Sequence, residues 1–310
     1  MKKIIIDTDC GSDDAMAIAA ALNDPGYEIL CFTCVAGNVT VEQAARNTLF
    51  TIETVGKSTP PVYLGCGHPV KAELVGAYET HGNDGMGDLG YAPERLKISD
   101  GDAVDRMLEI IGESEDREIT LITLGPLTNV AAALDRKPDI MRKLDRVVVM
   151  GTAGLGPGNV TEVAEFNIWQ DPEAARTVFE SGLDIMAVGW DACTGESMLE
   201  QSDIDEISSS GKLGSIMVSA NRVLMALNRE RFGRNCLDMA DPAAVAAALY
   251  PECIRTAEKY RVKIICEKGP DYGNAELAEK TENGNCTVCS ALWPDLYRNY
   301  LKERLGNRNP

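Results

Sequence analysis

The chain contains 310 residues with a formal net charge of −18, and 45% of its residues are hydrophobic and 25% charged. This composition is typical of a globular protein and excludes a disordered one. The acidic balance argues against a nucleic-acid partner, since phosphate backbones are bound by clustered Lys and Arg, and no apolar run approaches the ~18 residues of a membrane span.

The first two thirds of the chain alternate short apolar segments with longer segments of helical pattern. Strands are predicted at Lys2–Thr8, Glu28–Ala36, Val62–Leu64, Glu118–Leu124, Arg146–Met150 and Asp184–Val188. Helices are predicted at Asp14–Leu22, Val41–Val55, Ala103–Ile111, Leu127–Leu144 and Pro172–Ser181. Apolar strands that alternate with helices indicate a mostly parallel sheet covered by helices on both faces.

The last third of the chain is less regular. Helices are predicted at Ile216–Leu227 and Pro242–Leu249, and a late strand at Tyr260–Cys266 forms a small antiparallel addition. No linker or repeat separates a second unit. We therefore expect one α/β domain over residues 1–310, with a Rossmann-like, mostly parallel central sheet and a helical C-terminal elaboration.

The N-terminus and the cysteines favour a cytoplasmic protein. Only Ile4, Ile5 and Ile6 follow the basic residues at the start, too few for the apolar region of a signal peptide. Ten cysteines are far below the density of a disulfide scaffold, so reduced thiols are expected.

Two cysteine pairs have the C-x2-C spacing of some zinc and redox sites, Cys31 with Cys34 and Cys286 with Cys289. The first pair lies in a predicted strand, where residues three apart face opposite ways. The two pairs are also far apart along the chain. Buried structural thiols are therefore favoured over a metal or redox site.

The segment after the first predicted strand, Asp7 to Asp14, contains four carboxylates at Asp7, Asp9, Asp13 and Asp14. Asp13 is well placed to cap the following helix, which explains one of them. Like charges about 4 Å apart repel by about 4 kcal/mol at an effective dielectric of 20, so four need protons or a cation. Oxygen ligands favour Ca²⁺ or Mg²⁺.

Two chemistries fit such a turn. One is phosphoryl transfer on a haloacid-dehalogenase-like fold, with Asp7 as nucleophile and Asp9 as acid/base. The other is hydrolysis assisted by a carboxylate-held metal ion. The first is disfavoured because the later Lys and acidic pair that it needs do not follow the predicted strands, and no P-loop is present.

The segment Asp7-Thr8-Asp9-Cys10-Gly11-Ser12-Asp13-Asp14-Ala15 resembles the N-terminal signature D-T-D-x-G-x-D-D-A of the inosine–uridine-type nucleoside hydrolases. The resemblance continues, in the family's order and spacing, at Ala36–Val39, Thr80–Gly85, Gly125–Asn129, Met150–Gly151, Asn159, Glu165–Asn167, Asp171–Ala174 and Asp241–Pro242. One such block is weak evidence, but this series over residues 4 to about 250 is specific.

The resemblance implies Ca²⁺-dependent hydrolysis of the N-glycosidic bond of ribonucleosides to free base and ribose. It implies that Asp9, Asp14 and Asp241 bind calcium through carboxylates and Leu124 through its backbone carbonyl. Asp9 is in addition the expected general base, which activates a metal-bound water. A homodimer or homotetramer is expected as well.

The same resemblance assigns substrate-binding roles. Asp13 matches the position that holds the 2′-hydroxyl, Asn38 and Asn167 orient ribose and nucleophile, and Asn159 and Glu165 lie near the 5′-hydroxyl. Met150, Phe166, His81 and Asp241 complete the expected substrate-binding set, with Asn38 and His81 also expected in catalysis. Glu165 and Asn167 flank Phe166 as alternating positions of a strand would. Asp7 is expected to orient the metal ligands.

The chain departs from the pattern at the leaving group. Many family members have a His directly before the last metal-binding Asp, whereas this chain has Ala240. His81 is the best remaining residue to contact or protonate the base. Trp190, Tyr78, Tyr91, Arg231, Arg234 and Asp238 are further candidates, whereas His68 is interpreted as structural.

Ala240 leaves two alternatives open. One is a metal- and ribose-binding relative that has lost catalysis, although the retained Asp9 argues against it. The other is a hydrolase for a nucleoside with a good leaving group, such as nicotinamide riboside, whose cationic base needs no acid to depart.

Overall fold

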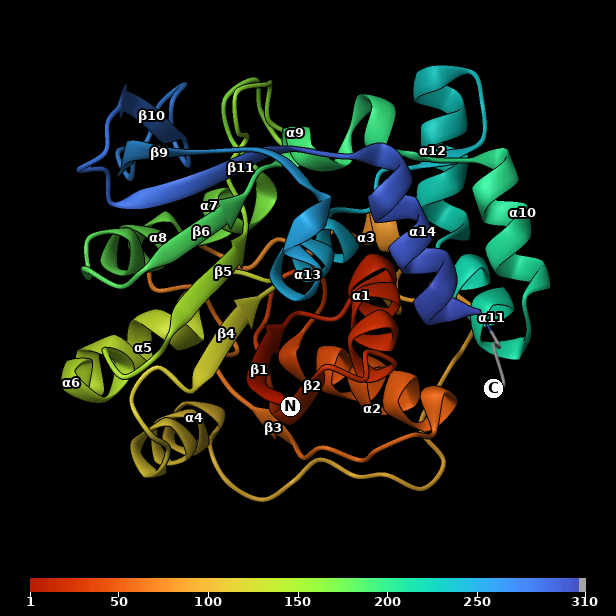
Figure 1. The fold of residues 1–310 in the computed structure, drawn as a ribbon, viewed down its shortest axis with the longest axis horizontal. Helices are drawn as coiled ribbons and strands as arrows, with labels where there is room; N and C mark the ends of the chain where they lie inside the picture. Colours follow the sequence, from red (N-terminus) through yellow and green to blue (C-terminus); the bar gives the residue numbers. More distant parts are fainter. Residues whose placement is uncertain (307–310) are drawn as a thin grey trace.

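A nine-stranded sheet with the order β10-β9-β11-β6-β5-β4-β1-β2-β3 runs through the computed structural model, which describes residues 1–306 (Figure 1). Its strands are β1 (Lys2–Thr8), β2 (Tyr27–Cys34), β3 (Val62–Leu64), β4 (Ile119–Thr123), β5 (Arg146–Met150), β6 (Ile185–Val188), β9 (Ile254–Ile264), β10 (Ala275–Lys280) and β11 (Cys286–Leu292). Among these strands only β9 runs against the direction of the others, so the predicted mostly parallel sheet is confirmed.

Helices cover both faces of this sheet (Figure 1). The α-helices are α1 (Ser12–Leu22), α2 (Val41–Val55), α3 (Tyr78–His81), α4 (Ala103–Glu113), α5 (Thr128–Arg136), α6 (Pro138–Met141), α7 (Phe166–Gln170), α8 (Pro172–Phe179), α9 (Trp190–Cys193), α10 (Gln201–Ser209), α11 (Lys212–Ala220), α12 (Arg222–Phe232), α13 (Ala240–Leu249) and α14 (Pro294–Leu305). Short 3₁₀ turns lie at Gly195–Ser197 and Pro251–Cys253, and β7 (Leu199–Glu200) pairs with β8 (Cys236–Leu237) in a separate ribbon. Within the described residues, no helix has the length and apolar character that crossing a bilayer requires.

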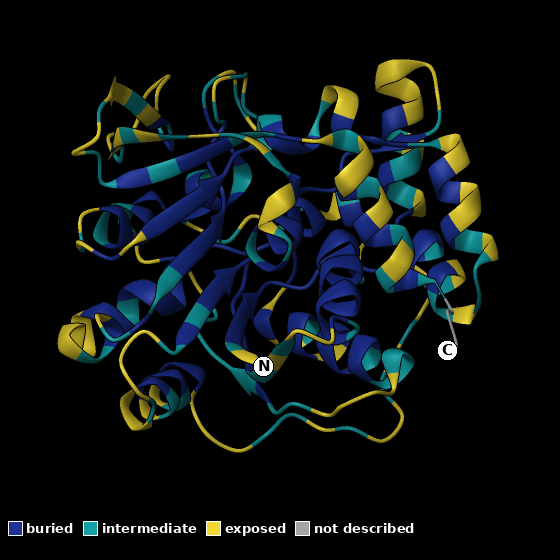
Figure 2. Ribbon diagram, viewed as in Figure 1, coloured by how far each residue is buried: buried dark blue, intermediate teal, exposed yellow. Residues whose placement is uncertain are grey.

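The sheet separates two hydrophobic cores, which explains why its strands lack polar alternation. In β1, Ile4 and Ile6 belong to the core beneath α1, α2 and α13, whereas Ile5 belongs to the core beneath α4, α5 and α8. Burial in dark blue follows the central strands and the inner helix faces (Figure 2). A strand buried on both faces must be apolar at every position.

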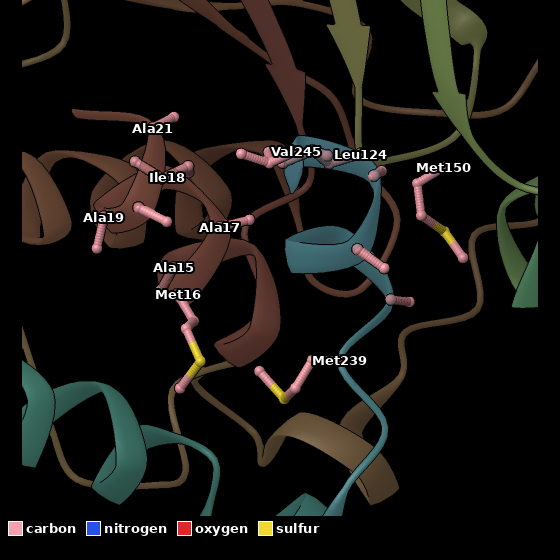
Figure 3. Close-up of a cluster of buried hydrophobic side chains, with 14 of the residues drawn as sticks. Ala15, Met16, Ala17, Ile18, Ala19, Ala21, Leu124, Met150, Met239 and Val245 are labelled. Carbon is pink, nitrogen blue, oxygen red and sulfur yellow. The ribbon is translucent and has the colours of Figure 1, made fainter. Parts of the chain in front are cut away.

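Helices α1 and α13 are the most deeply buried helices and pack against each other (Figure 3). All residues of α1 are buried, and α13 is buried except for Ala248. Both are rich in alanine, whose small side chain lets two helices approach closely while retaining the highest helix propensity. Their N-termini thereby come to the same edge of the sheet.

Three predicted elements differ from the structure. The helix predicted at Ile216–Leu227 is divided at Asn221 into α11 and α12. The helix predicted at Leu127–Leu144 is interrupted at Lys137, which takes φ −148° and ψ 70° and separates α5 from α6. Pro138 is the cause, because proline has no N–H and disfavours helical geometry in the residue before it.

The C-terminal part is not only helical. The late strand begins at Ile254 and joins the main sheet as β9, and β11, which was not predicted, inserts between β6 and β9. With β10, these strands extend the sheet by three positions at one edge.

The cysteine pair in β2 has the predicted orientation. Cys31 lies in one core and Cys34 in the other, so the two thiols face opposite sides of the sheet. All ten cysteines are free thiols. Burial raises the pKa of Cys31 to about 12, which disfavours the thiolate that metal binding and redox exchange require.

Candidate active site

The site lies where the strand order of the sheet reverses. From β1 the chain proceeds through β2 and β3 to one side, and then crosses back to β4 on the other side of β1. The segments that follow β1 and β4 diverge at this switch point and leave a crevice beyond the carboxyl ends of the strands, where open α/β sheets bind their ligands. The backbone N–H of Leu124 donates to the carbonyl of Asp7 at 2.8 Å and joins the two segments.

Helix α1 begins at Ser12, two residues earlier than expected. The N-cap is Gly11, and the prediction that Asp13 caps this helix is wrong, because Asp14 makes the capping contact. Its carboxylate accepts hydrogen bonds from the Thr8 hydroxyl at 2.5 Å and the Gly11 N–H at 2.8 Å. Asp13 and Asp14 then lie in the first turn, where the helix dipole favours negative charge.

Three carboxylates converge above this turn. Asp13, Asp14 and Asp241 each offer an oxygen within 4.8 Å of the others, and all three side chains are buried. Asp241 comes from the first turn of α13, so two helix N-termini bring the group together. Burial and the neighbouring charge of Asp13 raise the pKa of both Asp14 and Asp241.

Asp9 lies beside this group but outside it. Its Oδ2 accepts the backbone N–H of Asn38 at 2.7 Å, and its Oδ1 is buried without a hydrogen-bond partner among the described residues. Burial, followed by the charge of Asp14, raises its pKa well above the usual range. Of the three expected carboxylate ligands, the structure therefore groups Asp14 and Asp241 with Asp13 and leaves Asp9 at their edge.

The donor set fits a hard divalent cation. Buried carboxylates that repel one another are stabilised when a cation lies among them, and unpaired buried oxygens are costly otherwise. Such oxygens are present at Oδ1 of both Asp9 and Asp13. Carboxylate and carbonyl oxygens favour Ca²⁺ or Mg²⁺ over softer metals.

Two asparagines make contacts at the carboxyl ends of the strands. Asn38, after β2, donates from Nδ2 to Asp14 at 3.2 Å. Asn167 donates to the carbonyl of Leu124, directly after β4, at 2.7 Å and to that of Met150, the last residue of β5, at 3.2 Å. Asn38 is therefore bonded to the acidic group, and Asn167 joins α7 to the ends of β4 and β5.

The segment around Glu165 is helical and not extended as predicted. Glu165 is the N-cap of α7, and its carboxylate accepts the N–H groups of Asn167 at 2.9 Å and Ile168 at 3.3 Å. Asn159 accepts the N–H of Phe166 at 2.9 Å. Glu165, Asn159 and Asn167 still face the crevice. Hydrogen bonds at the start of α7 orient them, in place of the alternation of a strand. Burial raises the pKa of Glu165 to about 7.

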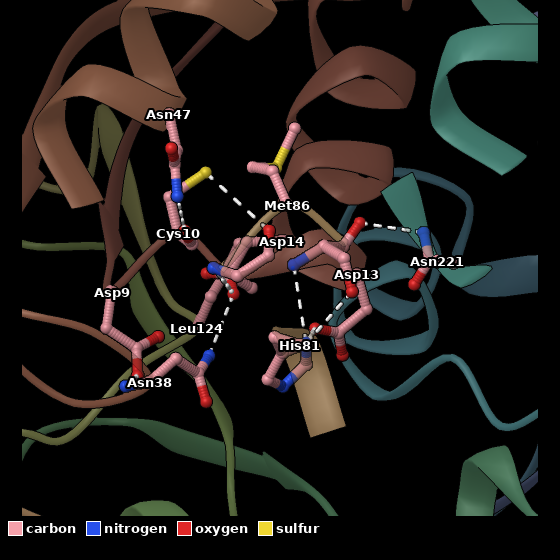
Figure 4. A network of polar contacts seen from close by, with 12 residues as sticks. Asp9, Cys10, Asp13, Asp14, Asn38, Asn47, His81, Met86, Leu124 and Asn221 are labelled. Atoms are coloured by element: carbon pink, nitrogen blue, oxygen red, sulfur yellow. Dashed lines mark hydrogen bonds and ion pairs between the residues drawn. The ribbon is translucent and has the colours of Figure 1, made fainter. Parts of the chain in front are cut away.

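His81 ends helix α3 and contacts the start of α1. Its Nδ1 lies 2.9 Å from the Ser12 hydroxyl and 3.4 Å from the Ser12 N–H, with the Asp13 carboxylate at 3.7 Å (Figure 4). A backbone N–H can only donate, so Nδ1 accepts and the proton of the neutral ring lies on Nε2. That N–H is then available to a ligand.

Asp7 was expected to orient the metal ligands, but among the described residues no hydrogen bond joins its side chain to Asp9, Asp14 or Asp241. Its Oδ2 accepts from the Thr33 hydroxyl at 2.6 Å and from Asn129 at 2.7 Å. Asn129 also donates to the Cys34 carbonyl and so joins the ends of β1 and β2. Burial raises the pKa of Asp7 to about 7.

A pocket opens over these residues. Expected site residues that line it are Asp13, Asn38, His81, Leu124, Met150, Asn159, Glu165, Phe166, Asn167 and Asp241, whereas Asp9 and Asp14 lie outside its lining. Trp190, Arg231, Asp238 and Ala240 also line it, as does Thr80, which belongs to the Thr80–Gly85 segment of the resemblance. Ala77, Val160 and Leu224 complete the lining. The sequence did not single out these three apolar residues, which only the fold brings to the pocket.

Several other candidates lie elsewhere. Tyr91 stacks on Phe50 with ring centroids 4.6 Å apart, and the ring of Tyr78 is partly exposed outside the pocket lining. Arg234 pairs with Glu200, away from the pocket. His68 is exposed, as the structural interpretation expected.

Comparison with known proteins identifies this arrangement of fold and acidic crevice. The model of the inosine-uridine preferring nucleoside hydrolase family matches residues 4–298. The chain therefore belongs to this family, whose members are ribonucleoside hydrolases, and the resemblance noted in the sequence is confirmed.

Individual relatives agree with this assignment. The chain is 35% identical to the pyrimidine-specific ribonucleoside hydrolase RihA of Salmonella agona, over 83% of this chain and 82% of the relative. A plant nucleoside hydrolase superposes with a TM-score of 0.90 at 31% identity, covering 99% of both chains. A purine-preferring ribonucleoside hydrolase from Gardnerella vaginalis gives the same TM-score at 27% identity, covering 98% of both. The fold and the enzyme class are thus shared by relatives whose names differ in the preferred base.

Proposed function

We propose that this enzyme hydrolyses ribonucleosides to free base and ribose with Ca²⁺ as cofactor and Asp9 as general base. The observation that carries the proposal is the convergence of Asp13, Asp14 and Asp241 within 4.8 Å of one another, beside a buried, unpartnered oxygen of Asp9. A bound cation supplies positive charge that offsets the repulsion among these carboxylates and lowers the pKa of nearby water.

Asp9 is suited to accept a proton. Its Oδ2 is fixed by the Asn38 N–H, so Oδ1 is left to receive the proton of a water molecule that attacks the sugar. The raised pKa of Asp9, caused first by burial and then by Asp14, makes it a stronger base than an exposed carboxylate. We assign metal binding to Asp14, Asp241 and the Leu124 carbonyl, with Asp9 completing the set.

The remaining residues are assigned to the sugar and the base. Asp13 is assigned to the 2′-hydroxyl, Asn38 and Asn167 to ribose orientation, and Asn159 and Glu165 to the 5′-hydroxyl. Met150 and Phe166 form apolar walls beside them. His81 presents Nε2–H to the base. Fixed donors and acceptors of this kind lower a barrier by orienting the substrate without reorganising.

The test is release of ribose by the calcium-loaded protein from inosine, adenosine, guanosine, uridine, cytidine and nicotinamide riboside. We expect turnover of at least one nucleoside and its loss by a factor of about 10² or more in Asp9→Asn. Asp139→Asn, an exposed carboxylate on α6, is the matched control and keeps full activity. Calcium binding without any ribose release would contradict catalysis and favour the ribose-binding alternative.

Ala240 bears on which nucleosides the enzyme cleaves. It lines the pocket at the position where a leaving-group His is common, and it has no proton to donate. Cleavage restricted to nicotinamide riboside would indicate that the enzyme has specialised in a leaving group that needs no acid. We also propose a homodimer or homotetramer and a cytoplasmic location, and size-exclusion chromatography with light scattering tests the former.

A further inference from the structure

Among the described residues that line the pocket, Arg231 is the only Lys or Arg. The charged side chains around it are acidic, namely Asp13, Glu165, Asp238 and Asp241. The side chain of Arg231 nevertheless has no hydrogen bond or ion pair with any residue from 1 to 306. The two other arginines near the end of this helix have partners, since Arg229 donates to Asn235 at 2.8 Å and Arg234 pairs with Glu200. An uncommitted guanidinium at the rim of an acidic pocket is available to a ligand.

The surroundings of Arg231 define where its charge acts. Arg231 lies in the exposed last turn of α12, and Asp238 is buried after β8. Asn228 donates to Asp238 at 2.7 Å and to the Cys236 carbonyl at 3.1 Å, which fixes that carboxylate against the pocket. Burial raises the pKa of Asp238, and the charge of Arg231 acts in the opposite direction. The two groups therefore interact through space without forming an ion pair.

Cleavage of the glycosidic bond places negative charge on the departing base. When the C1′–N bond breaks, its electron pair passes to the base nitrogen, and a neutral purine or pyrimidine base departs as an anion unless it is protonated. Ala240 supplies no donor. A positive group with several N–H donors stabilises such charge as it develops.

We propose that Arg231 stabilises the departing base by donating hydrogen bonds to it. This inference rests on the proposed nucleoside hydrolysis. The guanidinium keeps its proton, since arginine remains charged in proteins. The attacking water gives its oxygen to C1′ and one proton to Asp9, and the base anion takes a proton from solvent. Asp9 then releases its proton to solvent, which restores the carboxylate. The products are ribose and neutral base, so atoms and charges balance.

Arg231 and the fixed carboxylate of Asp238 act together. Asp238 attracts the guanidinium over the pocket and limits its orientations, so that its donors point at the base. Asp238 is thus a positioning residue, and Arg231 touches the substrate. Asn228 holds Asp238 and completes the support.

Comparison of two leaving groups tests the proposal. Uridine or inosine needs help to release its base, whereas p-nitrophenyl β-D-ribofuranoside releases a phenolate that is already stable. We expect Arg231→Met to lower kcat for the natural nucleoside roughly tenfold to a hundredfold, as for a lost hydrogen bond from a charged donor, and to leave the phenyl riboside nearly unchanged. Arg231→Lys should recover part of the loss, and Asp238→Asn should show the same selectivity with a smaller effect.

Arg234→Met is the matched control, because it removes a nearby arginine that pairs outside the pocket. Circular dichroism and calcium binding verify that each variant is folded. Equal losses on both substrates, or no loss on either, would overturn the role of Arg231. If the unaltered enzyme cleaves neither a nucleoside nor the phenyl riboside, the proposed function fails, and this inference with it.

Discussion

Gly37 and Gly125 determine where the carboxylate of Asp9 lies. A Cβ atom at Gly37 would lie 2.1 Å from Oδ2 of Asp9, and one at Gly125 would lie 2.8 Å from its Cγ. These distances are shorter than any real contact, so each glycine is required for the close approach of two backbones around one side chain. The position of the Asp9 carboxylate thus depends on two glycines that have no side chain.

We therefore expect Gly37→Ala to lower kcat by a factor of about 10² while calcium still binds, because a displacement of about 1 Å at a reacting group has this effect. Gly112→Ala is the control. Its Cβ would meet Ile140 at 3.7 Å, an ordinary contact, and alanine in a helix stabilises by about 0.5–1 kcal/mol over glycine. Ribose release and urea unfolding distinguish the two, and full activity in Gly37→Ala would show that Asp9 is not held as described.

The cap of helix α7 makes the stability of the protein depend on pH. The five residues of α7 follow Glu165, and burial raises the pKa of the Glu165 carboxyl from 4.5 to about 7. Between these two values the folded protein retains a proton that the unfolded chain releases. The free energy of unfolding therefore falls as the pH rises through this window.

We expect the melting temperature of the metal-free protein to fall between pH 5 and pH 8, and Glu165→Gln to reduce that slope. The neutral amide cannot lose a proton, so its contribution is independent of pH. Glu180→Gln, at the exposed C-terminal end of α8, serves as control for the loss of one carboxylate and keeps the parent slope. Parallel curves for Glu165→Gln and the parent would contradict this account. Thermal unfolding across this pH range provides the measurement.

Elements were predictable where burial dictates composition. The six parallel strands from β1 to β6 were predicted to within a few residues, because both of their faces are buried and each is an apolar run. Strand β11 was missed because Cys286–Leu292 mixes cysteine, threonine and serine with few large apolar residues. The break at Pro138 was readable from the sequence, but the apolar pattern continued across it.

The site was predictable where several polar residues recur close together. The four carboxylates between Asp7 and Asp14 indicate a cation-binding group through their spacing alone. Ala77, Val160 and Leu224 line the same pocket without such a signal, since isolated apolar residues are more often core. The grouping of Asp13 with Asp14 and Asp241, in place of Asp9, depends on how two helix N-termini meet, which spacing along the chain does not reveal.

At the scale of the whole molecule, the acidic group ties together distant parts of the chain. Asp13 and Asp14 begin α1, and Asp241 lies in α13, which packs on α1. The unfolded chain does not hold these carboxylates together. A cation that binds only the folded form adds stability that grows with its concentration, about 2.7 kcal/mol at a hundred times its Kd.

Calcium should accordingly raise the melting temperature in a concentration-dependent way, and a chelator should lower it. Asp14→Asn and Asp241→Asn should abolish most of the shift, since each removes one carboxylate of the group. Asp139→Asn, on the surface of α6, keeps it. An unchanged calcium shift in Asp241→Asn would place the cation elsewhere. Differential scanning calorimetry with and without about 1 mM calcium, roughly the affinity range of weak protein sites, provides the readout.

The position of β11 has a consequence for how the protein is made. This strand, Cys286–Leu292, lies between β6 and β9, and among the described residues β9 and β10 have no other ladder that joins them to the sheet. Because β11 follows both strands in the sequence, it leaves the ribosome after them. Until residue 292 has emerged, the edge of β9 that β11 covers in the folded sheet has no partner, whereas β10 remains an edge strand afterwards. The pairing of this last strand is therefore a late step that attaches a preceding hairpin to the sheet.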